Sequence, residues 1–318
     1  MSDPHPRRIT RRSAMLTGLG AGAAVLLAER AAAAAAASPL ITKAIPATGE
    51  RLPVIGLGTD KFRDAAQEPI TAEIRRMQQL GGTVIDTAAA YGDSEALIGQ
   101  ALAASPGLRD RLFLATKLTA SGGGYFGRGA AGAASLEQSL ARLKTPRVDL
   151  LQVHNLDGVE ALMPQLQQWK QAGKIRYFGI TTSRVAQHEQ MLGFMQRYPL
   201  DFIQVDYSID NRDAARQILP LAAQRRIAVL ANIPFGFGAV LRQAQTRKLP
   251  AWAADIDVTS WGQFLLKYVV SHPAVTCAIP GSTQVAHLED NQGAARGRLP
   301  DEAMRRKMEQ FWLDSAAK

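Results

Sequence analysis

Eight short apolar runs, rich in β-branched residues, recur along the chain with a longer stretch after each. The longer stretches carry apolar residues three and four positions apart, as in Leu162, Leu166 and Trp169, which is the spacing of one buried helix face. Eight strands alternating with helices predict a parallel sheet closed into a (β/α)₈ barrel. The apolar runs cover residues 54–59, 83–88, 112–117, 149–154, 175–180, 202–207, 227–232 and 276–281.

An open, doubly wound sheet is the alternative for such a pattern. Folds of that kind usually carry a G-x-G-x-x-G turn after the first strand. Gly56 and Gly58 begin that turn here, but the following residues do not continue it, which favours the barrel. Residues 40–53 are predicted to form a hairpin that turns at Thr48–Gly49 and caps the bottom of the barrel. Residues 301–312 are predicted to form an extra helix.

The first 37 residues have a composition that does not fit the barrel. Arg11 and Arg12 precede an apolar stretch at residues 14–28, and seven alanines follow at residues 31–37. The apolar stretch is too short and too rich in Ala and Gly to span a bilayer stably. A basic start, an apolar centre and small residues at the end are the layout of a secretory signal.

The paired arginines make this segment similar to a twin-arginine signal, although Ala14 stands where a large apolar residue is usual. An ordinary secretory signal or an uncleaved anchor is the alternative. We expect residues 1–37 to direct export to the periplasm through the twin-arginine machinery. Residues 38–318, which show no linker, are expected to form one barrel domain with no stable membrane span.

Charge and cysteine content exclude several classes of function. The net charge is +9, but the basic residues are scattered and do not interleave with aromatic residues, so we expect no nucleic-acid partner. Cys277 is the single cysteine, which excludes an internal disulfide, and its apolar surroundings predict a buried, inert thiol. His188, His272 and His287 lack the spacing of metal ligands, so we expect no metal site.

Ionisable side chains gather where the predicted strands end. Asp86 lies near the end of the second run, Lys117 ends the third and His154 the fourth, and Tyr91 follows Asp86 by five positions. In (β/α)₈ barrels the active site lies at the carboxyl ends of the strands, so these side chains are expected to meet. A single Asp or Lys at a strand end is commonly a surface residue, but four such groups on three consecutive strands indicate a site.

These residues lie in stretches that resemble the aldo/keto reductase family, from about Ile41 to the last helix. The resemblance implies a catalytic tetrad of Asp86, Tyr91, Lys117 and His154. It also implies reduction of a small-molecule carbonyl compound, an aldehyde or ketone, to an alcohol. The matching stretches are LPVIGLGT from residue 52, VIDTAAAYGDSEALIG from 84, ATK from 115, DLLQVHN from 149, GKIRYFGIT from 173, IQVDYS from 203 and IPGS from 279.

The expected roles agree with the chemistry of carbonyl reduction, which needs a hydride on carbon and a proton on oxygen. A free tyrosine has a pKa of about 10, and a neighbouring cation stabilises its phenolate. Tyr91 is therefore expected to be the general acid and Lys117 the cation that tunes it. Asp86 is expected to orient Lys117, and His154 to hydrogen-bond the substrate oxygen.

The resemblance also implies a nicotinamide cofactor that lies across the mouth of the barrel. The family commonly has Ser-Asn after the fifth strand, where this chain has Thr181 and Thr182, whereas Gln204 matches. The family often stacks an aromatic residue on the nicotinamide at the end of the seventh strand. This chain has Asn232 at that position and Phe235 three residues later, so either residue is a candidate for that contact.

The phosphate end of the cofactor is expected at Gly281 and Ser282, which precede a helix and its free backbone N–H groups. Asp290 and Asn291 fall where the family contacts adenine. Gly281 and His287 replace basic residues that hold the 2′-phosphate in many members. NADPH is therefore the expected cofactor with NADH possible, and the preference is expected to be modest unless another cation, such as Arg184, contacts the phosphate.

Two other functions fit part of this pattern. A nucleotide-binding regulatory or sensor subunit on the same barrel does not require all four tetrad residues, and turnover of NADPH with a generic aldehyde discriminates it from a reductase. An unrelated isomerase or hydrolase barrel is disfavoured because the chain shows neither an acid pair nor a metal site.

Overall fold

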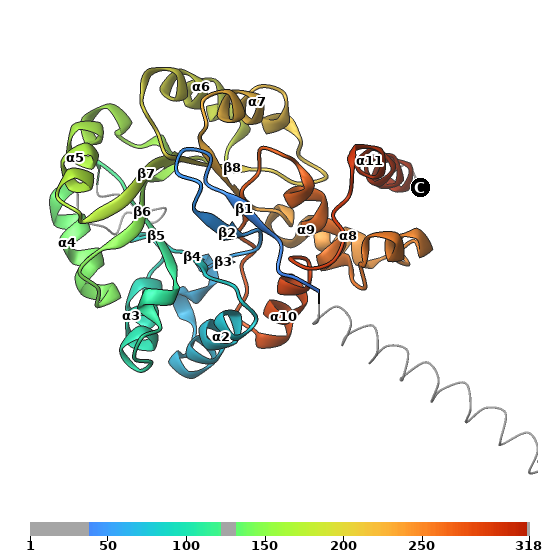
Figure 1. Ribbon diagram of the computed structural model, residues 1–318, viewed down its shortest axis with the longest axis horizontal. Helices are drawn as coiled ribbons and strands as arrows, with labels where there is room; N and C mark the ends of the chain where they lie inside the picture. The colour runs from blue at the N-terminus through green and yellow to red at the C-terminus, as the bar shows by residue number, and fades with distance from the viewer. Residues whose placement is uncertain (1–37, 122–131, 317–318) are drawn as a thin grey trace, which may run out of the picture. The chain divides into compact units, whose positions relative to one another are not determined.

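The computed structural model of the protein describes residues 38–121 and 132–316 (Figure 1). The predicted signal sequence, residues 1–37, lies outside the described residues. From Leu40 onward the chain forms one structural unit. Within the described residues, no helix is both long and apolar enough to cross a membrane.

All eight predicted strands are present, and each pairs in parallel with the next one along the chain. Parallel bridges between Ile55 and Ala278 and between Gly58 and Gly281 join the first strand to the last, which closes the predicted (β/α)₈ barrel. The strands are β3 (Leu57–Gly58), β4 (Val84–Asp86), β5 (Phe113–Leu118), β6 (Val148–Val153), β7 (Ile175–Thr181), β8 (Phe202–Asp206), β9 (Ala228–Asn232) and β10 (Cys277–Ala278).

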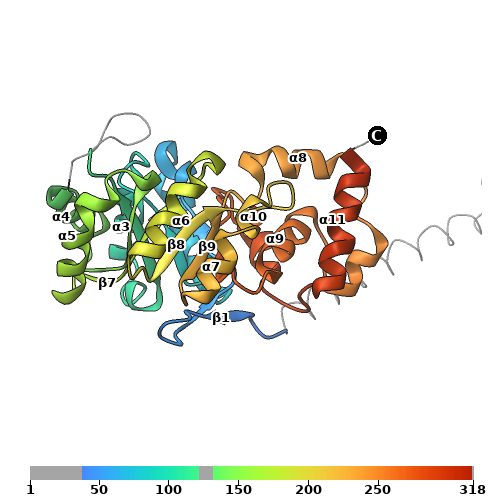
Figure 2. The same ribbon diagram turned by 90° about the horizontal axis from the view of Figure 1, so that it is seen from above.

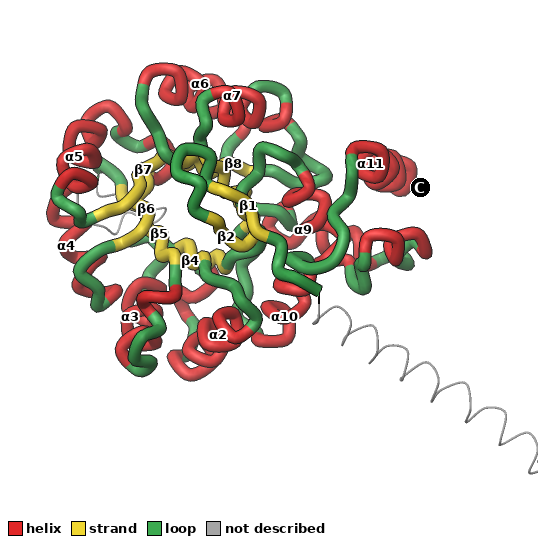
Figure 3. The backbone as a smooth tube through the Cα atoms, viewed as in Figure 1, coloured by secondary structure: helices red, strands yellow, loops and turns green. Residues whose placement is uncertain are grey.

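Helices surround the strands, as the tube drawing shows (Figure 3). Each packs an apolar face inward, and in α5 this face includes Leu162, Leu166 and Trp169, as the spacing predicted. The predicted last helix is confirmed as α11 and extends further than residues 301–312. The helices are α2 (Gln67–Gln79), α3 (Ser94–Ala103), α4 (Gly132–Leu143), α5 (Val159–Gln171), α6 (His188–Arg197), α7 (Ile218–Gln224), α8 (Ala239–Gln245), α9 (Trp261–Ser271), α10 (Val285–Gly293) and α11 (Glu302–Ala316).

The predicted hairpin is confirmed as β1 (Thr42–Ala44) and β2 (Arg51–Pro53), an antiparallel pair that crosses the barrel in Figure 1. Its turn includes Gly49 at φ +79°, a conformation that favours glycine. Tyr177, near the start of β7, donates a hydrogen bond to Glu50 at 2.6 Å. The hairpin therefore covers the amino ends of the strands, and the opposite end remains for the site.

The barrel interior is filled with apolar side chains from the strands and the hairpin. Phe113, Tyr177 and Phe202 form an aromatic cluster with ring centroids 5.5–6.0 Å apart. Cys277 belongs to the same interior cluster, and burial raises the pKa of its thiol, which agrees with the predicted inert cysteine. The interior is thus a packed core, so only the carboxyl ends of the strands are open to ligands.

The longest connection between consecutive strands, from β9 to β10, carries α8, the 3₁₀ helix η7 (Ala251–Ile256) and α9. Figure 2, turned by 90°, shows α8 and α11 beside α9 at one side of the barrel. Trp261 at the start of α9 stacks on Phe311 of α11 with ring centroids 6.3 Å apart. This connection extends the wall around the open end of the barrel.

Candidate active site

A cavity of about 880 Å³ opens at the carboxyl ends of the strands. It takes in all four residues of the predicted tetrad and continues to the start of α10. Such a volume falls in the range of small-molecule and cofactor sites. Its lining consists of Gly58, Thr59, Asp60, Lys61, Asp86, Tyr91, Lys117, His154, Asn155, Thr181, Ser183, Gln204, Asn232, Ile233, Pro234, Phe235, Phe237, Gly238, Leu241, Gln245, Ser260, Trp261, Gly262, Ile279, Gly281, His287, Asp290 and Asn291.

Strand register brings the tetrad together. Asp86 is the last residue of β4, Lys117 lies in β5, and His154 begins the 3₁₀ helix η3 (His154–Leu156) directly after β6. Tyr91 lies in the turn between β4 and α3, where its backbone N–H donates to the carbonyl of Ala88 at 3.0 Å. Because parallel neighbours end at the same edge, the four side chains converge there.

Lys117 contacts two of the other three tetrad residues, Asp86 and Tyr91. Its Nζ donates to Asp86 Oδ2 at 2.5 Å, to the Thr87 carbonyl at 2.9 Å and to the Tyr91 hydroxyl at 3.4 Å. The Lys117 side chain is only 1% exposed, and the Asp86 side chain 3%. All three ammonium protons are therefore engaged, which fixes the cation beside the Tyr91 hydroxyl.

Two glutamines complete the surroundings of Asp86. Gln152 donates to Oδ1 at 3.3 Å and Gln204 to Oδ2 at 3.2 Å. Gln204, predicted to contact the cofactor, thus lies at the site with its amide nitrogen toward Asp86. Gln152 was not among the predicted site residues, although a polar residue in the middle of the apolar run of β6 was a usable signal. These contacts disperse the buried negative charge of Asp86 and hold its orientation.

Tyr91 stays protonated at neutral pH. Burial raises the pKa of its hydroxyl, and the Lys117 cation lowers it by less, so the net pKa lies above the ordinary value. The expected role of Tyr91 rested on the effect of the cation, whereas burial has the larger effect on its pKa. For Lys117 itself, burial lowers the pKa, but Asp86 and Tyr91 together raise it by more. The net pKa therefore lies above the ordinary value, and the lysine remains charged. A neutral phenol beside a fixed cation is the arrangement that a proton donor needs.

His154 is neutral. Burial and then the Lys117 charge lower the pKa of its imidazole to about 3. The ring meets that of Tyr91 edge-on, with centroids 5.7 Å apart and planes at 81°. A neutral imidazole carries one N–H, which suits a hydrogen bond to a carbonyl oxygen without a competing positive charge.

The low pKa of His154 predicts a pH dependence of stability. Since the imidazole stays neutral when folded and protonates near pH 6.5 when unfolded, stability falls as the pH drops from 6.5 toward 3. By pH 5 the loss is roughly 2 kcal/mol, and above pH 6.5 His154 contributes no slope. Urea unfolding of wild type and His154→Gln between pH 5 and 8 measures it. Identical pH profiles of the two proteins would contradict the assignment.

Of the two residues predicted to contact the cofactor after the fifth strand, one faces the cavity and the other does not. Thr181 lines the cavity, but Thr182 does not. The Thr182 hydroxyl donates to Gln187 at 2.5 Å and is fully buried on the other side of the chain. Ser183 lines the cavity, and the sequence analysis missed it. Since neighbouring side chains of an extended segment point to opposite sides, Thr181 and Ser183 share one face.

The segment after β9 forms another part of the wall. Asn232 Nδ2 donates to the Thr182 carbonyl at 3.1 Å, while its buried Oδ1 has no hydrogen-bond partner among the described residues. Both predicted residues, Asn232 and Phe235, line the cavity. Phe237 also does, and it is 73% exposed with φ +53°. An apolar side chain held in that conformation at a cavity rim is unusual, because non-glycine residues rarely adopt positive φ.

At the far end of the cavity, Gly281, His287, Asp290 and Asn291, four of the residues predicted to contact the cofactor, line the wall. Ser282 is buried and outside the lining, and its hydroxyl bonds the main chain of Gln284 instead. Asp290 accepts from Ser260 at 2.7 Å and from Gln263 at 2.9 Å. The Asp290 carboxylate is therefore fixed in place by its own neighbours.

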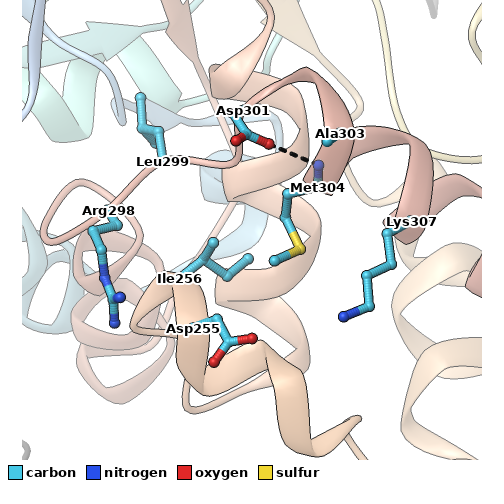
Figure 4. Close-up of a pocket in the computed structure, with 8 residues that line it drawn as sticks. All are labelled: Asp255, Ile256, Arg298, Leu299, Asp301, Ala303, Met304 and Lys307. Carbon is cyan, nitrogen blue, oxygen red and sulfur yellow. Dashed lines mark hydrogen bonds between the residues drawn. The ribbon is translucent and has the colours of Figure 1, made fainter.

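A second cavity, of about 460 Å³, lies between η7, the stretch around Arg298 and the start of α11 (Figure 4). Asp301 is drawn beside it and accepts from the backbone N–H of Met304 at 2.8 Å, which caps α11. No tetrad residue lines this cavity. Asp301 caps α11 and Arg298 pairs with Asp257, so the large cavity is the candidate active site.

Among residues 38–121 and 132–316, no three His, Cys, Asp or Glu side chains gather as metal ligands would. His188 Nε2 lies 3.1 Å from Asp206 Oδ1. His272 Nδ1 accepts a hydrogen bond from the backbone N–H of Ala274 at 3.2 Å.

Comparison with known proteins agrees with this geometry. The model of the aldo/keto reductase family matches residues 54–310. Methylglyoxal reductase YeaE of Escherichia coli (strain K12) is 30% identical over 247 residues, which is 76% of this chain and 84% of that protein. An aldo/keto reductase structure from Klebsiella pneumoniae in complex with NADP and acetate is 27% identical, with a TM-score of 0.70 over 83% of this chain and 93% of the other.

A second Klebsiella pneumoniae aldo-keto reductase, in complex with NADPH, is 25% identical, with a TM-score of 0.71 over 86% of this chain and 96% of the other. The chain therefore belongs to the aldo/keto reductase family and is an NAD(P)H-dependent oxidoreductase. The resemblance inferred from the sequence motifs is confirmed at the level of the family.

Proposed function

We propose that the protein reduces the carbonyl group of a small aldehyde or ketone to an alcohol with NADPH, and that Tyr91 is the general acid. The observation that carries this proposal is the buried Lys117, which contacts both Asp86 and the Tyr91 hydroxyl while the His154 ring borders the same hydroxyl-bearing side chain. The Klebsiella relatives with bound NADP and NADPH support the choice of cofactor.

The cavity fits a dinucleotide. It runs from the tetrad to Asp290 and Asn291, far beyond what a small carbonyl compound requires. Asn232 Oδ1 is a buried acceptor without a partner in the described residues, and it suits the amide protons of a nicotinamide carboxamide. Thr181 and Ser183 add polar groups on the same wall. When bound, the dinucleotide supplies a hydride for the carbonyl carbon.

The residues of the chain supply the proton and hold the carbonyl oxygen in position. Tyr91 donates its proton to the carbonyl oxygen as the hydride adds to the carbon, so the products are the alcohol and oxidised cofactor. The Lys117 cation, 3.4 Å from the Tyr91 oxygen, stabilises the phenolate that remains. His154, neutral in the free protein, donates a hydrogen bond to the same substrate oxygen and orients it. Asp86 keeps Lys117 in position.

The substrate is proposed to be a small, oxygen-rich carbonyl compound such as methylglyoxal. The name of the Escherichia coli relative supports this class. In this chain Asn155, which directly follows His154, lines the cavity and is a polar side chain that suits such a substrate.

The proposed function is tested by turnover with purified protein. We expect consumption of NADPH on addition of methylglyoxal or a generic aromatic aldehyde, with formation of one alcohol per NADPH. A protein that binds NADPH tightly but consumes none with any of a panel of aldehydes and ketones would instead be a nucleotide-binding sensor.

We further propose that residues 1–37 direct export to the periplasm through the twin-arginine machinery. Support comes from the paired Arg11 and Arg12, the short apolar stretch and the run of alanines. A fold that binds a nucleotide benefits from export in the folded state, because the nucleotide is scarce outside the cytoplasm.

Replacing Arg11 and Arg12 by lysine keeps the charge and removes the planar guanidinium that a receptor reads. We expect the double variant to remain in the cytoplasm as an active precursor, measured by fractionation and immunoblotting. Lysines at Arg7 and Arg8 provide the matched control, which should be exported normally. Mature-length protein of the Arg11 and Arg12 variant at normal periplasmic levels would show that an ordinary secretory signal is present.

A further inference from the structure

Among the described residues, no arginine lines the far end of the cavity, where the phosphates of a dinucleotide are expected. Among the described residues that line it, the ammonium groups are those of Lys61 and Lys117. Lys117 is fully engaged by the tetrad, and Lys61 lies 3.8 Å from the Asp60 carboxylate. Arg184 is not in the lining, and Gly281 offers no side chain. A guanidinium for the phosphates must therefore come from outside the described lining.

Arg242 on α8 is not itself in the lining, but it lies among residues that are. Gly238, Leu241 and Gln245 line the cavity from the same short segment. Arg242 lies four residues after Gly238 and three before Gln245, so the three share one side of the helix. A Cβ atom on Gly238 would stand 2.9 Å from Arg242 Nη1, which shows that the guanidinium folds back over this glycine. The guanidinium thus borders the cavity wall.

The Arg242 guanidinium is exposed, and within the part of the chain that the structure describes, no carboxylate or carbonyl oxygen accepts a hydrogen bond from it. Several other exposed arginines are paired, as Arg298 is with Asp257 at 2.9 Å. Two carboxylates line this end of the cavity: Asp290 accepts from Ser260 and Gln263, and Asp60 Oδ1 would stand 3.0 Å from a Cβ atom on Gly281. An unpaired guanidinium presents up to five donors, whose planar geometry matches phosphate oxygens.

We propose that Arg242 binds a phosphate group of the dinucleotide and so supplies, from α8, the cation that Gly281 and His287 do not provide. This inference rests on the proposed use of the cavity by NADPH. The phosphate is either the 2′-phosphate or the pyrophosphate. If Arg242 contacts the 2′-phosphate, it selects NADPH over NADH. If it contacts the pyrophosphate, it strengthens the binding of both cofactors equally.

The test measures nucleotide binding rather than turnover. Dissociation constants of NADP⁺, NAD⁺, 2′,5′-ADP and ADP are determined at fixed ionic strength from quenching of tryptophan fluorescence, since Trp261 lines the cavity. The proteins are wild type, Arg242→Gln and Arg225→Gln. Arg225 is also exposed, but it precedes β9 and so lies at the opposite end of the barrel.

We expect Arg242→Gln to weaken binding about tenfold or more, the usual effect of losing one charge-assisted contact, and Arg225→Gln to leave it unchanged. Weaker binding of NADP⁺ and 2′,5′-ADP alone assigns Arg242 to the 2′-phosphate. Equal weakening of NADP⁺, NAD⁺ and ADP assigns it to the pyrophosphate. Unchanged binding of all four ligands overturns the inference while the proposed function stands. If wild type binds neither NADP⁺ nor NAD⁺, the proposed function itself fails.

Discussion

Replacing Tyr91 by phenylalanine is expected to lower the rate of carbonyl reduction by roughly 10²–10⁴-fold, the usual contribution of a positioned general acid. The substitution removes only the hydroxyl that accepts a hydrogen bond from Lys117 at 3.4 Å. The ring remains against His154, so the shape of the cavity is preserved. The affinity for NADPH should therefore change little, while the single-turnover rate with methylglyoxal falls.

Tyr177→Phe is the matched control, because it makes the same chemical change at the opposite end of the barrel, where the hydroxyl contacts Glu50. Its reduction rate should equal that of wild type. A Tyr91→Phe enzyme that reduces methylglyoxal at near the wild-type rate would show that another group donates the proton.

Replacing Lys117 by methionine is expected to remove activity and to destabilise the fold by about 3–5 kcal/mol, because it leaves the Asp86 carboxylate buried without its cation. Two glutamine amides remain on that carboxylate, and they only partly compensate. The double variant Asp86→Asn with Lys117→Met removes both charges and should recover most of the stability but none of the activity. Urea unfolding and NADPH turnover on the same preparations measure the two effects separately.

Lys170→Met is the control for an exposed ion pair. Lys170 contacts Asp201 at 2.7 Å, but its side chain is 39% exposed, so its loss should cost no more than about 1 kcal/mol. Equal destabilisation by Lys117→Met and Lys170→Met would contradict the view that burial gives the Lys117–Asp86 pair its energetic weight.

The strands and the tetrad were predictable from sequence because they depend on regular features. Apolar runs of similar length gave all eight strands, and parallel pairing carries their ends to one edge, so Asp86, Lys117 and His154 had to meet. The hairpin at residues 40–53 followed from its turn residues. These predictions need only the period of the pattern and the topology of the sheet.

The finer details of the cofactor wall were not predictable in the same way. Whether Thr182 or Ser183 faces the cavity depends on where β7 ends, which shifts the alternation by one residue. Burial at the site, which outweighs the effect of Lys117 on the pKa of Tyr91, exists only in the folded chain. The approach of Arg242 to Gly238 depends on a left-handed glycine at φ +85°, which no periodic pattern reports.

The most direct test of the central claim is the stoichiometry of the reaction in one sample of purified wild-type protein with NADPH and methylglyoxal. NADPH consumption is followed by absorbance and the alcohol by chromatography, with Tyr91→Phe measured in parallel. The account predicts one alcohol formed for each NADPH consumed by wild type, and almost none by Tyr91→Phe, although both bind NADPH. Bound NADPH that is never oxidised by any carbonyl compound in the wild-type protein would contradict it.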